Sequence, residues 1–331
     1  MSRLWPETVD WRSPRPWLVA AVFLLLGLVP VASALASQPF YVTLFSRIMI
    51  FALAAVSLNL VLGFGGLVSF GHALYIGVGA YAVGMLSFHG VGSGWAHVAA
   101  ALVVSALIAT ATGIVCLRTS GIAFIMITLA FAQMFFFLVV SLKFYGGDDG
   151  LTVQQRSDFA PLDLAGNTAL YYAIFALLVL AVYASYRVVH SRFGMVLRGA
   201  KGNARRMRAL GFPVLGYQLV AYVVSACVCS LAGVLLANLT RFASPAYMAW
   251  NVSGDLILMV VLGGMGTIVG PLVGAIGLLI LEEILTALTQ HWMAVLGPII
   301  VLIVLLAKRG LYGSFLDWTA RRRRRGGSAA P

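Results

Sequence analysis

Charge is scarce in this 331-residue chain, and acidic charge is the scarcest. Charged residues make up only 10% of the sequence, with 10 Asp and Glu against 22 Lys and Arg. Soluble domains average about 25% charged residues. Hydrophobic residues reach 61%, and the mean hydropathy is +0.99. This composition excludes an ordinary soluble domain and predicts an all-α polytopic membrane protein.

Motifs of catalysis and nucleotide binding are also missing. The chain has no GxxxxGK[ST] phosphate-binding loop, no HExxH zinc motif and no GxSxG nucleophile motif. The three cysteines lie in apolar runs, and Cys227 and Cys229 point to nearly opposite sides of a helix. We therefore read the cysteines as packing residues and expect a chain that is not an enzyme, with no catalytic residue, cofactor or metal.

Ionisable residues inside the apolar runs are few. Arg47 is the clearest candidate for a mid-span charge, and its long side chain can extend towards the membrane surface. Glu282 and Glu283 fall near the end of an apolar run, so we expect them at the membrane interface. The sequence suggests no pair of intramembrane carboxylates that face a basic partner.

Apolar runs of about 20 residues, the length that spans a bilayer, follow one another along the chain. We predict ten spans, at about 17–36, 40–62, 72–88, 95–117, 121–142, 169–189, 218–239, 246–262, 272–288 and 292–307. The break at 263–271 is needed because an uninterrupted helix there would place the tail Arg321–Arg325 outside. Together the spans form one transmembrane region, 17–307.

Positive charge clusters at three places, which orients the spans. Three Lys and Arg precede the first span, seven lie between Arg187 and Arg208, and seven follow Ala307. The positive-inside rule makes the segment 1–16, the loop 190–216 and the tail 308–331 cytoplasmic, with both termini inside. The acidic loop 143–168 is then external. This placement, without base-reading motifs, excludes nucleic acid as the partner of the +12 charge.

A basic stretch, 191–217, carries six positive charges and no acid. On a helix its cations and its apolar residues fall on opposite sides. The cationic side holds Arg198, Lys201, Arg205 and Arg208, and the apolar side holds Val196, Leu197, Ala200, Ala204 and Met207. Two interpretations remain open at this point: a signal that only orients the protein, or a docking element for a soluble partner.

A glycine-rich break, GFGGLVSFGH at 63–72, separates the second and third spans. It is either a tight cytoplasmic turn or irregular backbone at membrane depth that lines a pathway. The candidate path residues are Asn59, Gly66, Ser69, Gly71, His72, Thr128 and Gln133. Small residues in the third span and at Gly270 and Gly274 allow close helix packing, in the bundle or at a dimer face.

Four blocks of the chain resemble a known family in the same order. They are SLNLVLGFGGLVSFGHALYIGVGAYA at 57–82, RTSGIAFIMITLAFAQ at 118–133 with GGDDGLT at 146–152, LMVVLGGMGTIVGPLVGA at 258–275, and KRGLYG at 308–313. The chain is similar to the membrane subunits of ATP-binding-cassette importers for branched-chain amino acids, of the longer-loop M type. Permeases for urea or short amides share most of these blocks and remain an alternative.

The resemblance implies a type II importer-like permease in the bacterial cytoplasmic (inner) membrane. It implies a heterodimer with a second permease, two ATP-binding subunits that hydrolyse ATP, and an external substrate-binding protein. The loop after the sixth span would carry the ATPase-coupling helix, with the matching residues Phe193, Gly194, Leu197, Arg198, Asn203, Ala204, Leu210 and Gly211. Acidic residues common in the family are missing at Gly202, Ala204 and Arg208, so we expect an acidic groove on the ATPase. An ion-coupled secondary transporter, which would need ionisable residues in mid-span, is the other alternative.

Overall fold

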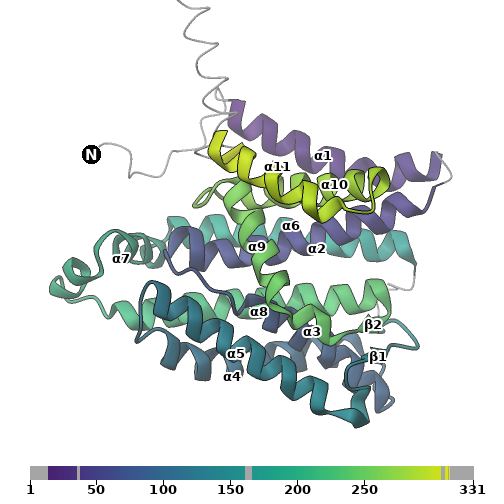
Figure 1. Cartoon of the computed structure of the whole chain (residues 1–331), viewed down its shortest axis with the longest axis horizontal. Helices are drawn as coiled ribbons and strands as arrows, with labels where there is room; N and C mark the ends of the chain where they lie inside the picture. Colours follow the sequence, from purple (N-terminus) through teal and green to yellow (C-terminus); the bar gives the residue numbers. More distant parts are fainter. Residues whose placement is uncertain (1–13, 36–37, 161–165, 307–309, 312, 314–331) are drawn as a thin grey trace, which may run out of the picture.

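The computed structural model describes residues 14–35, 38–160, 166–306, 310–311 and 313, and they form a helical bundle (Figure 1). The α-helices are α1 (Pro14–Leu35), α2 (Phe40–Asn59), α3 (His72–Phe88), α4 (Gly94–Cys116), α5 (Ile122–Ser141), α6 (Asn167–His190), α7 (Arg192–Ala209), α8 (Val214–Thr240), α9 (Trp250–Gly263), α10 (Gly270–Leu288) and α11 (Trp292–Leu306). Shorter elements are the π-helical turn η1 (Leu60–Phe64), the 3-10 turns η2 (Lys143–Tyr145) and η3 (Pro245–Met248), and the strands β1 (Leu151–Thr152) and β2 (Phe242–Ala243). Residues 1–13 of the predicted cytoplasmic segment 1–16 lie outside the described residues. So does most of the predicted tail 308–331, including Arg321–Arg325, of which only 310–311 and 313 are described.

Six of the described helices are long and apolar enough to cross a membrane, and four shorter apolar helices accompany them. Each falls within or close to one of the ten predicted spans, and the predicted break at 263–271 separates α9 from α10. The eighth predicted span begins with η3, so only α9 of that span is α-helical. The chain is thus a multi-pass membrane protein, while the count of ten spans and the placement of the termini stay predictions.

The centre of the bundle is α2, which is packed by α6, α8, α9 and α10. In its most apolar window 89% of the residues are buried, against 22% in α5 and 28% in α4 and α6. Lipid solvates apolar side chains, so the peripheral helices can stay apolar without being covered by protein. The apolar side chains of α2 instead pack against other helices in the core of the bundle.

Glycines allow the closest helix contacts. A Cβ atom on Gly79 of α3 would lie 1.9 Å from the carbonyl oxygen of Ser230, and one on Gly233 of α8 would lie 2.0 Å from that of Ile76. Likewise, a Cβ on Gly274 of α10 would lie 1.9 Å from the carbonyl oxygen of Met259. The glycine pair of the ninth predicted span therefore lies close to residues of α9 and of the loop after it, within the chain.

The two polar regions of the chain lie at opposite ends of the bundle (Figure 1). At one end is α7, and at the other β1 pairs antiparallel with β2, Leu151 opposite Ala243. The polar loop before α6 is tied to the end of α8, because Asn238 Oδ1 accepts a hydrogen bond from Ser157 N at 2.8 Å. This separation agrees with a loop on one side of the membrane and a basic segment on the other.

Candidate functional site

The basic segment forms α7, but not as one straight helix. Asn203 has an extended backbone (φ −159°, ψ 97°) and divides α7 into two helical pieces. Its Oδ1 atom accepts a hydrogen bond from Arg206 N at 2.9 Å and so caps the second piece. Met207 of the second piece packs against Gly199 of the first, where a Cβ atom would lie 2.8 Å from the Met207 sulfur.

Because of this bend, α7 is not the single two-sided helix that the sequence predicts. Val196, Leu197 and Ala200 are buried as expected, but they belong to the first piece only. Ala204 and Met207 are half-buried, while the cations of the second piece are exposed. The two-sided pattern assumed 100° per residue throughout, and one residue outside the helical region breaks that register.

The candidate coupling residues divide into anchors and surface residues. Phe193 and Leu197 pack in a small apolar cluster with Leu60 and Phe64 of η1. Gly194 is buried, and a Cβ there would lie 2.3 Å from the Val189 carbonyl oxygen, so only glycine fits.

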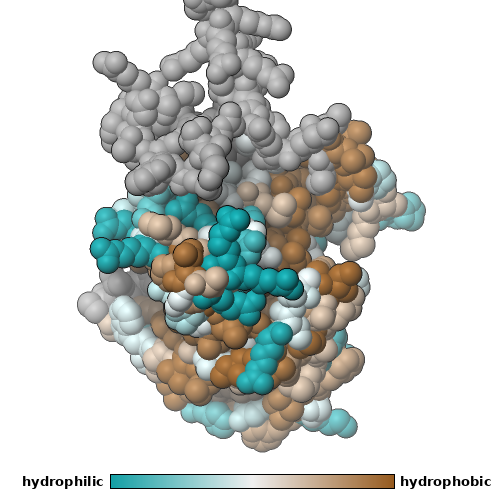
Figure 2. Space-filling view, turned by 90° about the vertical axis from the view of Figure 1, so that its left-hand side faces the viewer, coloured by the Kyte–Doolittle hydropathy of each residue, from teal (hydrophilic) through white to brown (hydrophobic). Residues whose placement is uncertain are grey.

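The remaining candidates are nearer the surface. Leu210 has 66% of its surface exposed, and Gly211 follows with a φ of +85° that ends the segment. Arg198 is half-buried and donates from Nε to the Gly194 carbonyl oxygen at 3.3 Å. Figure 2 looks onto this end of the molecule and shows hydrophilic residues gathered beside apolar surface.

The basic segment touches the glycine-rich break, 138 residues away in sequence. Lys201 donates from Nζ to the Gly63 carbonyl oxygen at 2.6 Å. Gly66 has a φ of +72°, and a Cβ there would lie 2.8 Å from Cγ of Lys201. The Lys201 side chain therefore packs against Gly66 and donates to Gly63, and these two contacts fix α7 to the end of η1.

The break itself does not turn tightly. After η1 the backbone is irregular as far as His72, which starts α3. His72 is fully buried, and its Nε2 lies 3.0 Å from Ser225 Oγ. Ser225 is eleven residues into α8, about 16 Å along the helix axis. The break therefore runs from the α7 end into the middle of the bundle, where surrounding helices cover its backbone.

The candidate path residues lie in separate places. Asn59 bridges α2 to the loop before α10, since its Nδ2 donates to the Thr267 carbonyl oxygen at 2.8 Å and its Oδ1 accepts from Gly266 N at 3.1 Å. Gly66 faces Lys201 instead, and Gln133 is half-buried further along α5.

Ser69, Gly71, His72 and Thr128 are the four that the structure brings together. Ser69 Oγ lies 3.1 Å from His72 Nδ1 and accepts from Gly71 N at 3.2 Å. Thr128 Oγ1 accepts from Phe70 N at 3.2 Å. These contacts hold the break against α5, so the cluster is an internal brace of the bundle.

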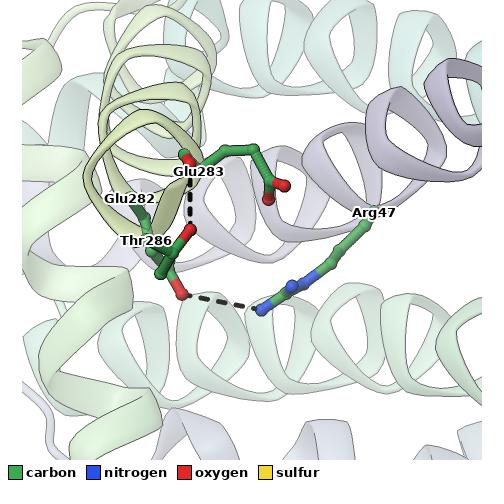
Figure 3. Close-up of polar contacts among 4 residues, drawn as sticks. All are labelled: Arg47, Glu282, Glu283 and Thr286. Carbon is green, nitrogen blue, oxygen red and sulfur yellow. Dashed lines mark hydrogen bonds and ion pairs between the residues drawn. The ribbon is translucent and has the colours of Figure 1, made fainter. Parts of the chain in front are cut away.

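One pair of charges was missed by the sequence analysis. Glu282 Oε1 of α10 lies 3.9 Å from Arg47 Nη2 of α2 (Figure 3). Both residues are far apart in sequence, and only the packing of α2 against α10 brings them together. A usable signal was present, because a charge inside a span requires a partner.

Metal chemistry has no support in the part of the chain that the structure describes. No group of three or more His, Cys, Asp and Glu residues lies close enough there to hold a metal ion. The cysteines are unpaired thiols, with Cys116 and Cys229 buried and Cys227 half-buried.

Comparison with known proteins supports one family. Residues 40–306 match the family described as "Branched-chain amino acid transport system / permease component". The high-affinity branched-chain amino acid transport system permease protein LivM of Salmonella typhimurium is 25% identical over 288 residues, which cover 80% of this chain and 68% of LivM. LivH of Escherichia coli, named as a permease of the same kind of system, is 25% identical over 285 residues, 80% of this chain and 91% of LivH.

A more distant relative is named for another substrate. The fructose import permease protein FruG of Bifidobacterium longum is 22% identical over 194 residues, which cover 53% of this chain and 56% of FruG. No solved structure matches this chain at a significant level.

Proposed function

We propose, from the premise that this chain belongs to the family of permease components of branched-chain amino acid transport systems, that it forms half of the pathway of an ATP-driven importer for leucine, isoleucine and valine. The chain is a permease subunit and not an enzyme. ATP is hydrolysed by separate subunits, and the second half of the pathway comes from a second permease. The importer would lie in the bacterial inner membrane.

The observation that carries the coupling role is the contact between Lys201 and Gly63. It joins the basic segment to an irregular stretch that runs into the bundle. An ATPase that grips α7 and closes on ATP would pull on the end of η1 through this contact. Beyond Gly66 the break belongs to no helix, so this pull would act on a stretch of backbone that is held by Ser69 and Thr128.

The buried and the exposed residues of the basic segment would have different roles in coupling. Phe193, Gly194 and Leu197 would anchor the segment to the bundle, and Ala204, Leu210, Gly211 and the exposed arginines would meet the ATPase. The basic surface favours an acidic groove on the partner. Arg198 and Asn203 shape the two pieces and set the angle between them.

The pathway would use the break as one wall. Ser69, Gly71, His72 and Thr128 are braced inside this chain, so they would shape the pathway and not bind the solute directly. Asn59 of α2, Gly66 of the break and Gln133 of α5 would contribute to the pathway from other positions. The ordered loop near β1 and β2, at the opposite end from α7, would face the external binding protein.

Uptake into proteoliposomes tests this function. The chain, its second permease, both ATPases and the binding protein would be reconstituted together and supplied with radiolabelled leucine, isoleucine, valine or urea. We expect ATP-dependent uptake of the branched-chain amino acids. Uptake of urea alone, or uptake driven by an ion gradient without ATP, would replace this proposal with one of the two alternatives.

A further inference from the structure

The Arg47–Glu282 pair lies within two apolar helices but is not covered by them. Arg47 is seven residues after the start of α2, about 10 Å along the axis, and Glu282 is six residues before the end of α10, about 9 Å. The Arg47 side chain is 49% exposed and that of Glu282 is 28% exposed. An exposed charge within a span either extends to the membrane surface or is covered by water, a solute or another protein.

The ion pair between Arg47 and Glu282 is long. The 3.9 Å between Nη2 and Oε1 exceeds the 2.7–2.9 Å or so that is typical of a charge-assisted hydrogen bond. The guanidinium carbon lies 5.9 Å from the centroid of the Phe51 ring, which supports the group on one side. A guanidinium has five N–H donors in a planar fork, and one distant carboxylate oxygen uses only part of them. Arg47 can therefore donate hydrogen bonds to a second carboxylate.

A further carboxylate lies on the neighbouring helix α9. Asp255 of α9 is exposed, and α9 packs against α10, the helix that carries Glu282. Three helices that pack against one another thus carry one cation, on α2, and two anions, on α9 and α10. One cation beside two anions is an arrangement that suits a ligand carrying both signs of charge.

We propose that Arg47, Glu282 and Asp255 form a binding site for the charged ends of an α-amino acid. The carboxylate of the solute binds the Arg47 guanidinium, and its ammonium group lies between Glu282 and Asp255. The solute replaces one loose ion pair with two closer ones, and its net charge of zero leaves the charge of the site unchanged. Urea and sugars carry neither charge, so this site selects against them. The inference rests on the proposed function and adds where the permease holds the solute.

Two double substitutions separate a solute site from a merely structural ion pair. In Arg47→Gln/Glu282→Gln both charges are removed together, and in Arg47→Glu/Glu282→Arg they are exchanged. A structural pair tolerates replacement of both partners far better than loss of one, and exchange restores it. A solute site tolerates neither, because the carboxylate of leucine then meets a neutral or negative group at position 47.

The assay is leucine uptake by the complete reconstituted importer, with assembly of all subunits measured alongside. We expect both double variants to assemble and to lose uptake by about tenfold or more, the loss of one good charge-assisted contact. Thr286→Val, one turn of α10 from Glu282 and also exposed, is the matched control and keeps the parental rate. Parental uptake in the exchanged variant would overturn the site. Absence of leucine uptake in the parent itself would instead refute the proposed function.

Thiol labelling gives an independent result that does not need the double variants to fold. Thr43 is exposed, one turn of α2 before Arg47 and on the same side of the helix. We expect Thr43→Cys in the complete importer to react with a charged, membrane-impermeant thiol reagent, and saturating leucine to slow the reaction. The parent, whose cysteines are buried or half-buried, is the blank. No labelling would mean that lipid or the second permease covers this face, and labelling that leucine leaves unchanged would equally contradict the site.

Discussion

Single residues at contacts between distant segments carry most of the functional argument. Lys201 is the clearest case, since one ammonium group joins α7 to the last turn before the glycine-rich break. Its stem also lies against Gly66, where no side chain fits. Among the six cations of the basic stretch, the sequence offers no way to distinguish this lysine from the arginines around it. Its role depends on a partner 138 positions away.

Lys201→Met tests that role. Methionine keeps an apolar stem against Gly66 but removes the donor to the Gly63 carbonyl oxygen. A hydrogen bond from a charged group contributes about 1.5–3 kcal/mol, so we expect leucine uptake per ATP hydrolysed to fall by about tenfold or more while the complex still assembles. Arg118→Met, which removes an exposed cation after α4 and outside α7, is the control and should leave that ratio near the parental value. Equal effects of the two changes would reduce Lys201 to one charge among several.

Glycines in α8 provide a second test at the same scale. Gly233→Ala places a methyl group 2.0 Å from the Ile76 carbonyl oxygen, which forces α3 and α8 apart. Overpacking of this kind costs about 1–3 kcal/mol, and we expect a lower thermal unfolding temperature in detergent. Gly216→Ala in the same helix meets no atom within 4 Å and gains helix propensity. It should match or exceed the parent, and a Gly233→Ala protein as stable as the parent would contradict the packing.

At the scale of elements, hydrophobic patterning predicts the helices well because lipid imposes a simple rule. Apolar runs of sufficient length become helices, and α6 and α10 begin and end within two residues of their predictions. The bend at Asn203 and the π-helical turn η1 were not predicted, because each depends on neighbours in space. The bend at Asn203 is stabilised by the hydrogen bond between Asn203 Oδ1 and Arg206 N and by the contact between Met207 and Gly199. The charges at 47 and 282 were visible, but their pairing required the packing of α2 and α10.

Asn203 gives the prediction at this scale. Asn203→Ala removes the cap from Arg206 N and favours a continuous helix, at a cost of about 1 kcal/mol to the second piece. We expect the affinity of the permease pair for the ATPase subunits, measured by co-purification at graded concentrations, to fall by several-fold. Asn203→Ser retains a capping oxygen and should restore most of the affinity. Failure of serine to restore binding would show that the amide, and not the bend, is what the ATPase contacts.

At the scale of the whole molecule, the fold places a basic end opposite an end with the only two strands among the described residues. If the positive-inside rule applies, α7 is cytoplasmic and the polar loop near β1 is external. Reporter fusions after Gly150 and after Gly327 test this arrangement. We expect the first to report the external side and the second the cytoplasm. A fusion after Gly327 that reported the external side would disprove the ten-span count, most simply by merging α9 and α10 into one span.

The central claim is that α7 is the surface on which the ATPase acts, and photo-crosslinking tests it most directly. A benzophenone amino acid replaces Leu210, which is 66% exposed beside α7, or Phe144, which is 70% exposed near β1 at the other end. After irradiation of the complete importer, the account predicts a covalent adduct between position 210 and an ATP-binding subunit, and none from position 144. An ATPase adduct from position 144 and none from position 210 would contradict it.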